Sequence, residues 1–226
     1  MVLLNENSKL YAHRYRYLLL SQFLFVVLYS LFEGRSGALV LLEVTFLVTL
    51  LVSAFIAVAQ RKHFLFVCVL AFMMLLLRWT AVMVDSQSLA IVSAALAVLF
   101  FVYIVVIIST DIFVRAEKVS ADLIYGAVSV YWMIGMAFAF VYVLLEFASP
   151  GSFSNIALSV DAEQPTLSSY VYFSFVTLST LGYGDMTPLT RHAGVTAYME
   201  AILGQLYLAI LMARLVGMYL ADVQKK

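Results

Sequence analysis

The sequence predicts an all-α integral membrane protein with six transmembrane helices and one re-entrant helix. Of its 226 residues, 65% are hydrophobic and only 12% are charged. A soluble domain of this length has too little interior to bury so much apolar surface. The apolar residues also gather into runs close to the roughly 20 residues that cross a bilayer as a helix. One further apolar stretch is too short to cross, so we expect it to re-enter the membrane.

Six apolar runs are the predicted spanning helices: residues 17–32, 38–59, 64–84, 88–110, 122–148 and 193–220. The first run follows basic residues, as in a signal peptide, but a turn-like stretch and no small-residue cleavage site come after it. We therefore expect a retained helix. Basic residues gather in the N-terminal segment, the second and fourth connections and the tail, which places both termini in the cytoplasm. The expected location is a plasma membrane, as a multi-pass protein of a bacterial inner membrane.

Charge and motif content exclude several classes of protein. Thirteen basic residues balance thirteen acidic ones, so no net field favours nucleic acid as a partner. No H-E-x-x-H or G-x-S-x-G motif occurs, so we expect neither an enzyme nor a bound cofactor. A secondary transporter would carry interrupted helices in corresponding positions of two repeated halves, whereas this chain has a single interrupted region. We therefore rank a transporter well below a channel.

The interrupted region is "VTLSTLGYGDMTP", residues 176–188, which follows the short apolar stretch 170–178. Non-helical backbone inside a bilayer is tolerated only where protein buries it or where it lines a watery cavity. Gly182 and Gly184 can adopt positive φ at little steric cost, and successive carbonyls on one side require this. A cation's hydration shell can then be replaced by the Thr180 hydroxyl and by the carbonyl oxygens of Thr180, Leu181, Gly182 and Tyr183. One strand cannot encircle an ion, so several copies must surround an axis.

The segment from Thr180 to Gly184, T-L-G-Y-G, resembles the T-V-G-Y-G signature of tetrameric potassium channels. The resemblance implies a homotetramer that conducts K⁺ passively and selectively, with membrane lipids and three identical subunits as partners and permeant K⁺ as its ion. Leu181 stands where valine is common, and both side chains face away from the ions. The resemblance also makes residues 170–179 the pore helix, whose C-terminal dipole favours a cation.

The same resemblance assigns supports to this filter. Asp185 follows it, as in the family, but Tyr172 and Phe173 stand where paired tryptophans are common in the pore helix. The usual tryptophan–aspartate hydrogen bond is therefore absent, and a bond from the Tyr172 hydroxyl to Asp185 is its substitute. Apart from the resemblance, Glu146, at the end of the fifth run, and Glu200, in the sixth, can brace the filter from behind by their positions. Structural carboxylates are the alternative for both.

The last run resembles the family's inner helix. Gly204 lies where a bending glycine is common, and the alternative is close helix packing. Leu208, Met212 and Val216 recur at four-residue spacing and form one stripe. The stripe lines the inner cavity or the gate in one interpretation, and it faces lipid or another helix in the other.

The order of six spans resembles voltage-gated channels, but the fourth run, 88–110, carries no basic residue. Steep voltage gating by moving arginines is therefore excluded. The expected division is a cytoplasmic segment (1–16), a peripheral four-helix domain (17–110), an amphipathic linker (111–121), a pore domain (122–223) and a tail (224–226). The linker resembles the segment that couples peripheral helices to the pore, and an ordinary surface helix is the alternative.

Glu43 and Arg78 are charges inside the second and third runs, at similar depth below the outer boundary. A charge in the membrane needs a partner, so we expect them to pair. Separate snorkelling, with Asp85 beside Arg78, is the alternative. A non-selective cation channel and a silent or regulatory channel subunit remain as alternative functions.

Overall fold

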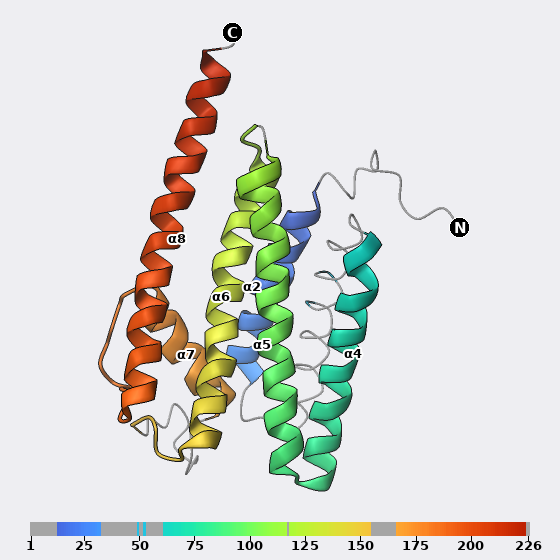
Figure 1. Cartoon of the computed structure of the whole chain (residues 1–226), viewed down its shortest axis with the longest axis vertical. Helices are drawn as coiled ribbons and strands as arrows, with labels where there is room; N and C mark the ends of the chain where they lie inside the picture. The colour runs from blue at the N-terminus through green and yellow to red at the C-terminus, as the bar shows by residue number, and fades with distance from the viewer. Residues whose placement is uncertain are drawn as a thin grey trace. The chain divides into compact units, whose positions relative to one another are not determined.

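The structure is a computed structural model, and it describes residues 13–32, 49, 52, 61–116, 118–154 and 166–224. These residues form helices and connecting turns, and their only strand-like pairing is an isolated bridge between Phe153 and Pro188. The helices are α2 (Arg14–Phe32), α4 (Arg61–Val84), α5 (Gln87–Thr110), the π-helical turn η1 (Asp111–Arg115), α6 (Ala121–Ala148), α7 (Leu167–Leu178) and α8 (Arg191–Val223) (Figure 1). The described chain is therefore α-helical, as predicted.

Four of the described helical stretches are long and apolar enough to cross a membrane. They are Phe64–Ala81 within α4, Gln87–Arg115 across α5 and η1, Ala121–Ala148 and Arg191–Val223. Helix α2 covers the first predicted run, whereas most of the second, 38–59, lies outside the described residues. The findings support an α-helical membrane protein, and the count of six spans stays a prediction.

Polar residues set several helix ends. Asp85, at φ 51°, forms the tight turn from α4 into α5. The Ser120 hydroxyl accepts a hydrogen bond from the N–H of Leu123 at 3.1 Å and so caps the start of α6. The Thr190 hydroxyl accepts from the N–H of Ala193 at 3.4 Å and so caps the start of α8.

The chain divides into two compact units, and the long helices contribute to both: residues 1–71, 104–132 and 218–226 form one unit, and residues 72–103 and 133–217 form the other. The first unit contains a cluster of charges around Asp111. Arg14 forms an ion pair with this carboxylate at 3.1 Å, the Tyr15 hydroxyl donates to it at 2.8 Å, and Arg115 approaches at 2.7 Å. The start of α2 is thus bonded to η1.

The predicted linker, residues 111–121, is only partly helical. It continues α5 as η1 and then becomes extended at Ala116, with ψ 125°. Helix α6 begins only at Ala121.

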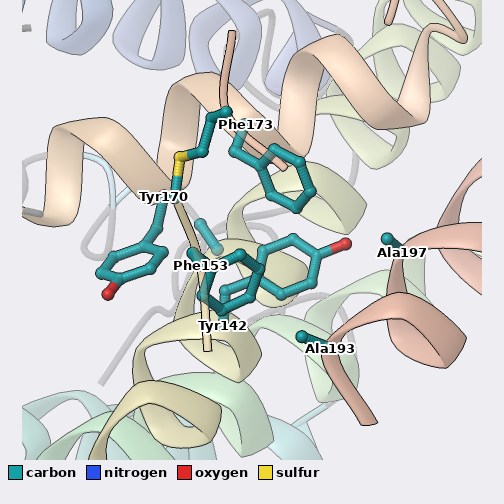
Figure 2. Packing of buried hydrophobic residues seen from close by; sticks show 8 residues of the cluster. Tyr142, Phe153, Tyr170, Phe173, Ala193 and Ala197 are labelled. Atoms are coloured by element: carbon teal, nitrogen blue, oxygen red, sulfur yellow. The ribbon is translucent and has the colours of Figure 1, made fainter. Parts of the chain in front are cut away.

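The second unit contains α7 and an aromatic core around it. The rings of Tyr142, Phe153, Tyr170 and Phe173 meet edge to face with centroids 5.0–5.5 Å apart (Figure 2). Ala193 and Ala197 of α8 complete this cluster. Edge-to-face rings add specific attraction to their burial, so the core fixes α7 against α6.

Candidate functional site

The segment after α7 begins by folding back onto the last turn of that helix. The N–H of Thr180 donates to the Thr177 carbonyl at 2.9 Å, and the N–H of Leu181 donates to the Val176 carbonyl at 2.9 Å. These bonds satisfy carbonyls that a helix end leaves free. Among the described residues, no backbone hydrogen bond ends on a carbonyl of residues 180–184. The start of the segment is therefore anchored to α7, while the carbonyls of residues 180–184 accept no backbone N–H of the described residues.

Positive φ angles alternate along this segment. Thr180 has φ 58°, Gly182 has φ 59° and Gly184 has φ 77°, while Leu181 and Tyr183 between them stay at negative φ. The sequence predicted positive φ at both glycines, and the structure confirms it. Thr180 was not expected to share it. An alternation of positive and negative φ along the segment fits carbonyls that point to one side.

The aromatic and acidic residues beside this segment come together as a group. The Tyr172 hydroxyl donates to Asp185 Oδ2 at 2.5 Å, and its ring stacks on Tyr183 with centroids 6.5 Å apart. The N–H of Met186 donates to Asp185 Oδ1 at 2.9 Å. The Tyr172 bond is the main cause that holds the pKa of the Asp185 carboxyl below its ordinary value. The contact expected between Tyr172 and Asp185 is thus present, and its role in supporting a filter stays a prediction.

Residues 152–154, which follow α6, bond to residues 187–189, which follow the segment Thr180–Gly184. Ser154 donates its N–H to the Thr187 carbonyl at 2.8 Å, and Leu189 donates its N–H to the Ser152 carbonyl at 2.7 Å. The Ser154 hydroxyl accepts from the N–H of Thr187 at 2.8 Å. The polar residues after α6 are therefore paired with the residues that follow Thr180–Gly184, the candidate filter segment, and sequence periodicity does not reveal this pairing.

Helix α8 meets both the filter segment and α7. The Gln205 side-chain amide donates to the Thr180 hydroxyl at 3.2 Å. One residue earlier, a Cβ added to Gly204 would lie 2.3 Å from the Leu178 carbonyl oxygen. Gly204 therefore packs tightly on the end of α7, and bending at Gly204 stays a prediction. Sequence reasoning missed Gln205, although a lone amide in an apolar run is a recognisable signal.

The two carboxylates proposed as braces have different surroundings. Glu146 accepts the backbone N–H groups of Gly151 at 2.6 Å and Ser152 at 3.1 Å, so it holds the turn that follows α6. Glu200 is fully buried and contacts Ser174 of α7 and Tyr142 of α6. Glu200 therefore links α8 to the pore-helix candidate and to α6.

The remaining predicted residues are placed more simply. Leu208, Met212 and Val216 lie on α8 with 40%, 59% and 50% of their surface exposed in the single chain, which suits a cavity, a lipid or a subunit contact. Arg78 is half-buried in α4, but Glu43 lies outside the described residues, so their pairing stays a prediction.

Comparison with known proteins bears on this part of the chain. Residues 129–221 match a family model described as an ion channel. The match covers less than half of the chain, and it includes α7, the filter segment and nearly all of α8. No curated protein and no solved structure matches the chain. The match supports an ion channel in a membrane, and the matched residues include the T-L-G-Y-G motif.

Proposed function

We propose that the protein is a homotetrameric, potassium-selective channel that conducts K⁺ passively. The observation that carries the proposal is the alternation of positive φ at Thr180, Gly182 and Gly184 in a segment whose carbonyls accept no backbone hydrogen bond from the described residues. Carbonyl oxygens from Thr180 to Tyr183, with the Thr180 hydroxyl, take the place of water around the ion. The C-terminal end of α7 adds a favourable potential for a cation.

The side chains that one chain leaves uncovered support the proposed tetramer. Leu181 is 56% exposed and Tyr183 is 65% exposed in the single chain. Of the most apolar stretch of α8, a share of 17% is buried within the single chain, against 56% for the corresponding stretch of α6. Three further copies around an axis would cover the filter side chains and part of α8, and they would supply the remaining carbonyl ligands of each ion.

The proposed channel is not steeply voltage-gated, because α5 carries no arginine or lysine that the membrane field could move.

Its proposed topology is six spans with both termini cytoplasmic. Cys68 is the only native cysteine. A Cys68→Ser background with one new cysteine near either terminus tests the topology, and labelling of either terminus from the outside contradicts it.

Planar-bilayer currents from the purified, reconstituted protein test the function. We expect the reversal potential to follow the K⁺ gradient and to ignore the Na⁺ gradient. A reversal potential that follows both ions equally overturns selectivity in favour of a non-selective cation channel. A folded tetramer that passes no current supports the silent-subunit alternative.

Gly182→Ala is the informative variant, and Gly151→Ala is its matched control. Both glycines have positive φ and open space around a new Cβ, so alanine at either site carries a similar backbone strain. Only Gly182 lies in the filter segment. We expect Gly182→Ala to lose K⁺ selectivity and Gly151→Ala to keep it, and equal effects would refute the assignment of the filter.

A further inference from the structure

Glu200 joins three helices of the second unit through its carboxyl group. It lies in α8 with no exposed surface. Its Oε1 is 2.5 Å from the Ser174 hydroxyl of α7, and its Oε2 accepts from the Tyr142 hydroxyl of α6. Figure 2 shows the Tyr142 hydroxyl pointing toward α8, on the side of Ala197. The nearest groups that α6 and α7 present to this acid are therefore uncharged hydroxyls.

The Ser174 hydroxyl decides where the proton of this acid lies. Besides Glu200, Ser174 Oγ is 2.7 Å from the backbone carbonyl oxygen of Gly135 in α6. A carbonyl oxygen and an ionised carboxylate can only accept, and a serine hydroxyl has one proton to give. Both short contacts are hydrogen bonds only if Oε1 of Glu200 carries a proton. The bonds then run from Tyr142 to Glu200, from Glu200 to Ser174, and from Ser174 to Gly135.

We propose that Glu200 is a neutral carboxylic acid that positions α7, and through α7 the filter; the positioning role rests on the function proposed above. An ionised Glu200 would leave Ser174 facing two acceptors with a single proton. It would also bury a charge whose hydrogen-bonding neighbours are neutral, which is unfavourable in a low-dielectric interior. The neutral acid satisfies each polar group in the chain of bonds.

The position of Ser174 explains how the acid reaches the filter. Ser174 lies one helical turn before Leu178, and the last turn of α7 supplies the carbonyls that anchor Thr180 and Leu181. Helix α8 thus holds α7 at two successive levels, by hydrogen bonds from Glu200 and by close packing at Gly204. A shift of α7 at either level moves the anchors of the filter.

Infrared difference spectroscopy of the purified protein tests the protonation directly. A protonated carboxyl group has a C=O band that shifts in D₂O, and we expect Glu200→Gln to remove such a band at neutral pH. Glu146→Gln is the matched control, because Glu146 accepts two backbone N–H groups and its carboxylate needs no proton. A spectrum in which Glu200→Gln removes no such band overturns the neutral acid.

Conduction measurements test the positioning role separately. A glutamine at this site can donate to Ser174 and accept from Tyr142, so we expect Glu200→Gln to retain selectivity. Glu200→Ala removes the acceptor of the Tyr142 hydroxyl and leaves Ser174 only its bond to Gly135. We expect the K⁺/Na⁺ permeability ratio to fall about tenfold, as the loss of such bonds implies. Unchanged selectivity in Glu200→Ala, or its loss in Glu200→Gln, overturns the positioning role.

Tyr142→Phe keeps the test decisive if Glu200→Ala does not fold. It removes only the donor to Oε2, so we expect the acid C=O band to move to higher frequency and selectivity to fall partly. An unmoved band contradicts the chain of bonds. If the wild-type protein conducts no K⁺, the proposed function fails, while the infrared result still decides the protonation of Glu200.

Discussion

Replacing Gly204 by alanine tests whether α8 and α7 are packed as closely as the structure implies. The added Cβ would lie 2.3 Å from the Leu178 carbonyl oxygen and 2.9 Å from Leu178 Cδ1. Carbon and carbonyl oxygen ordinarily approach to about 3.3 Å, so one of the helices must shift by roughly 1 Å. The opposing atom belongs to the backbone of α7, so a side-chain rotation cannot relieve the contact.

The expected loss of stability can be worked from these contacts. Overpacking costs about 1–3 kcal/mol, and a rigid backbone partner places this site near the upper end. Replacing glycine by alanine within a helix returns about 1 kcal/mol, which leaves a net loss of about 2 kcal/mol. For a chain of this length that loss lowers the unfolding midpoint by roughly 4–8 °C.

Thermal unfolding of the purified protein in detergent measures this shift. Gly217→Ala is the matched control, since Gly217 lies in the same helix and a Cβ there meets no atom of the described residues within 4 Å. We expect the control to be unchanged or slightly more stable. Close packing of α8 on α7 at Gly204 is refuted if Gly204→Ala melts at or above the midpoint of Gly217→Ala.

The filter segment and the charge cluster in the first unit allow three more tests. The Tyr172 hydroxyl holds the pKa of Asp185 below its ordinary 3.8. The hydrogen bond between the two side chains therefore stabilises the fold fully above pH 3.8, and this stabilisation is lost as the pH falls further and Asp185 becomes protonated. We expect Tyr172→Phe currents to lack the wild-type loss in strong external acid, and an identical acid response would contradict this. Gln205→Leu removes the donor to Thr180, so K⁺ affinity measured by calorimetry should weaken about 2–10-fold; unchanged affinity would show that the bond is irrelevant to the ion. Asp111→Ala should lower the unfolding free energy by about 1–3 kcal/mol and leave K⁺ affinity intact, and an unchanged midpoint would count against the cluster.

The sequence was sufficient wherever one residue type has a local physical consequence. Gly182 and Gly184 were expected at positive φ because they lack a Cβ, and both adopt it. The short helix expected over residues 170–179 is α7, Leu167–Leu178. Its start was placed three residues late because Ser168 and Ser169 are polar, yet both are buried in the structure.

Contacts between distant residues could not be predicted in this way. Glu200 and Ser174 are 26 positions apart, and their meeting depends on how α8 is rotated about its axis against α7. The hydropathy pattern of a helix that is apolar on every face does not show which face packs against its neighbour. Tyr15 and Arg14 of α2 lie 96 and 97 positions before Asp111, to which they bond. These contacts likewise depend on how the helices are rotated and packed, which the hydropathy pattern does not contain.

The backbone strain of the filter segment is concentrated at Thr180. This residue is β-branched and non-glycine, yet it has φ 58°, a conformation that costs such a residue about 1–2 kcal/mol. Its N–H bond to Thr177 and the Gln205 bond to its hydroxyl oppose relaxation. The two glycines further along carry no comparable strain. The backbone therefore has most to gain by rearranging at the end that adjoins α7, and the bonds to Thr177 and Gln205 are what hold it there.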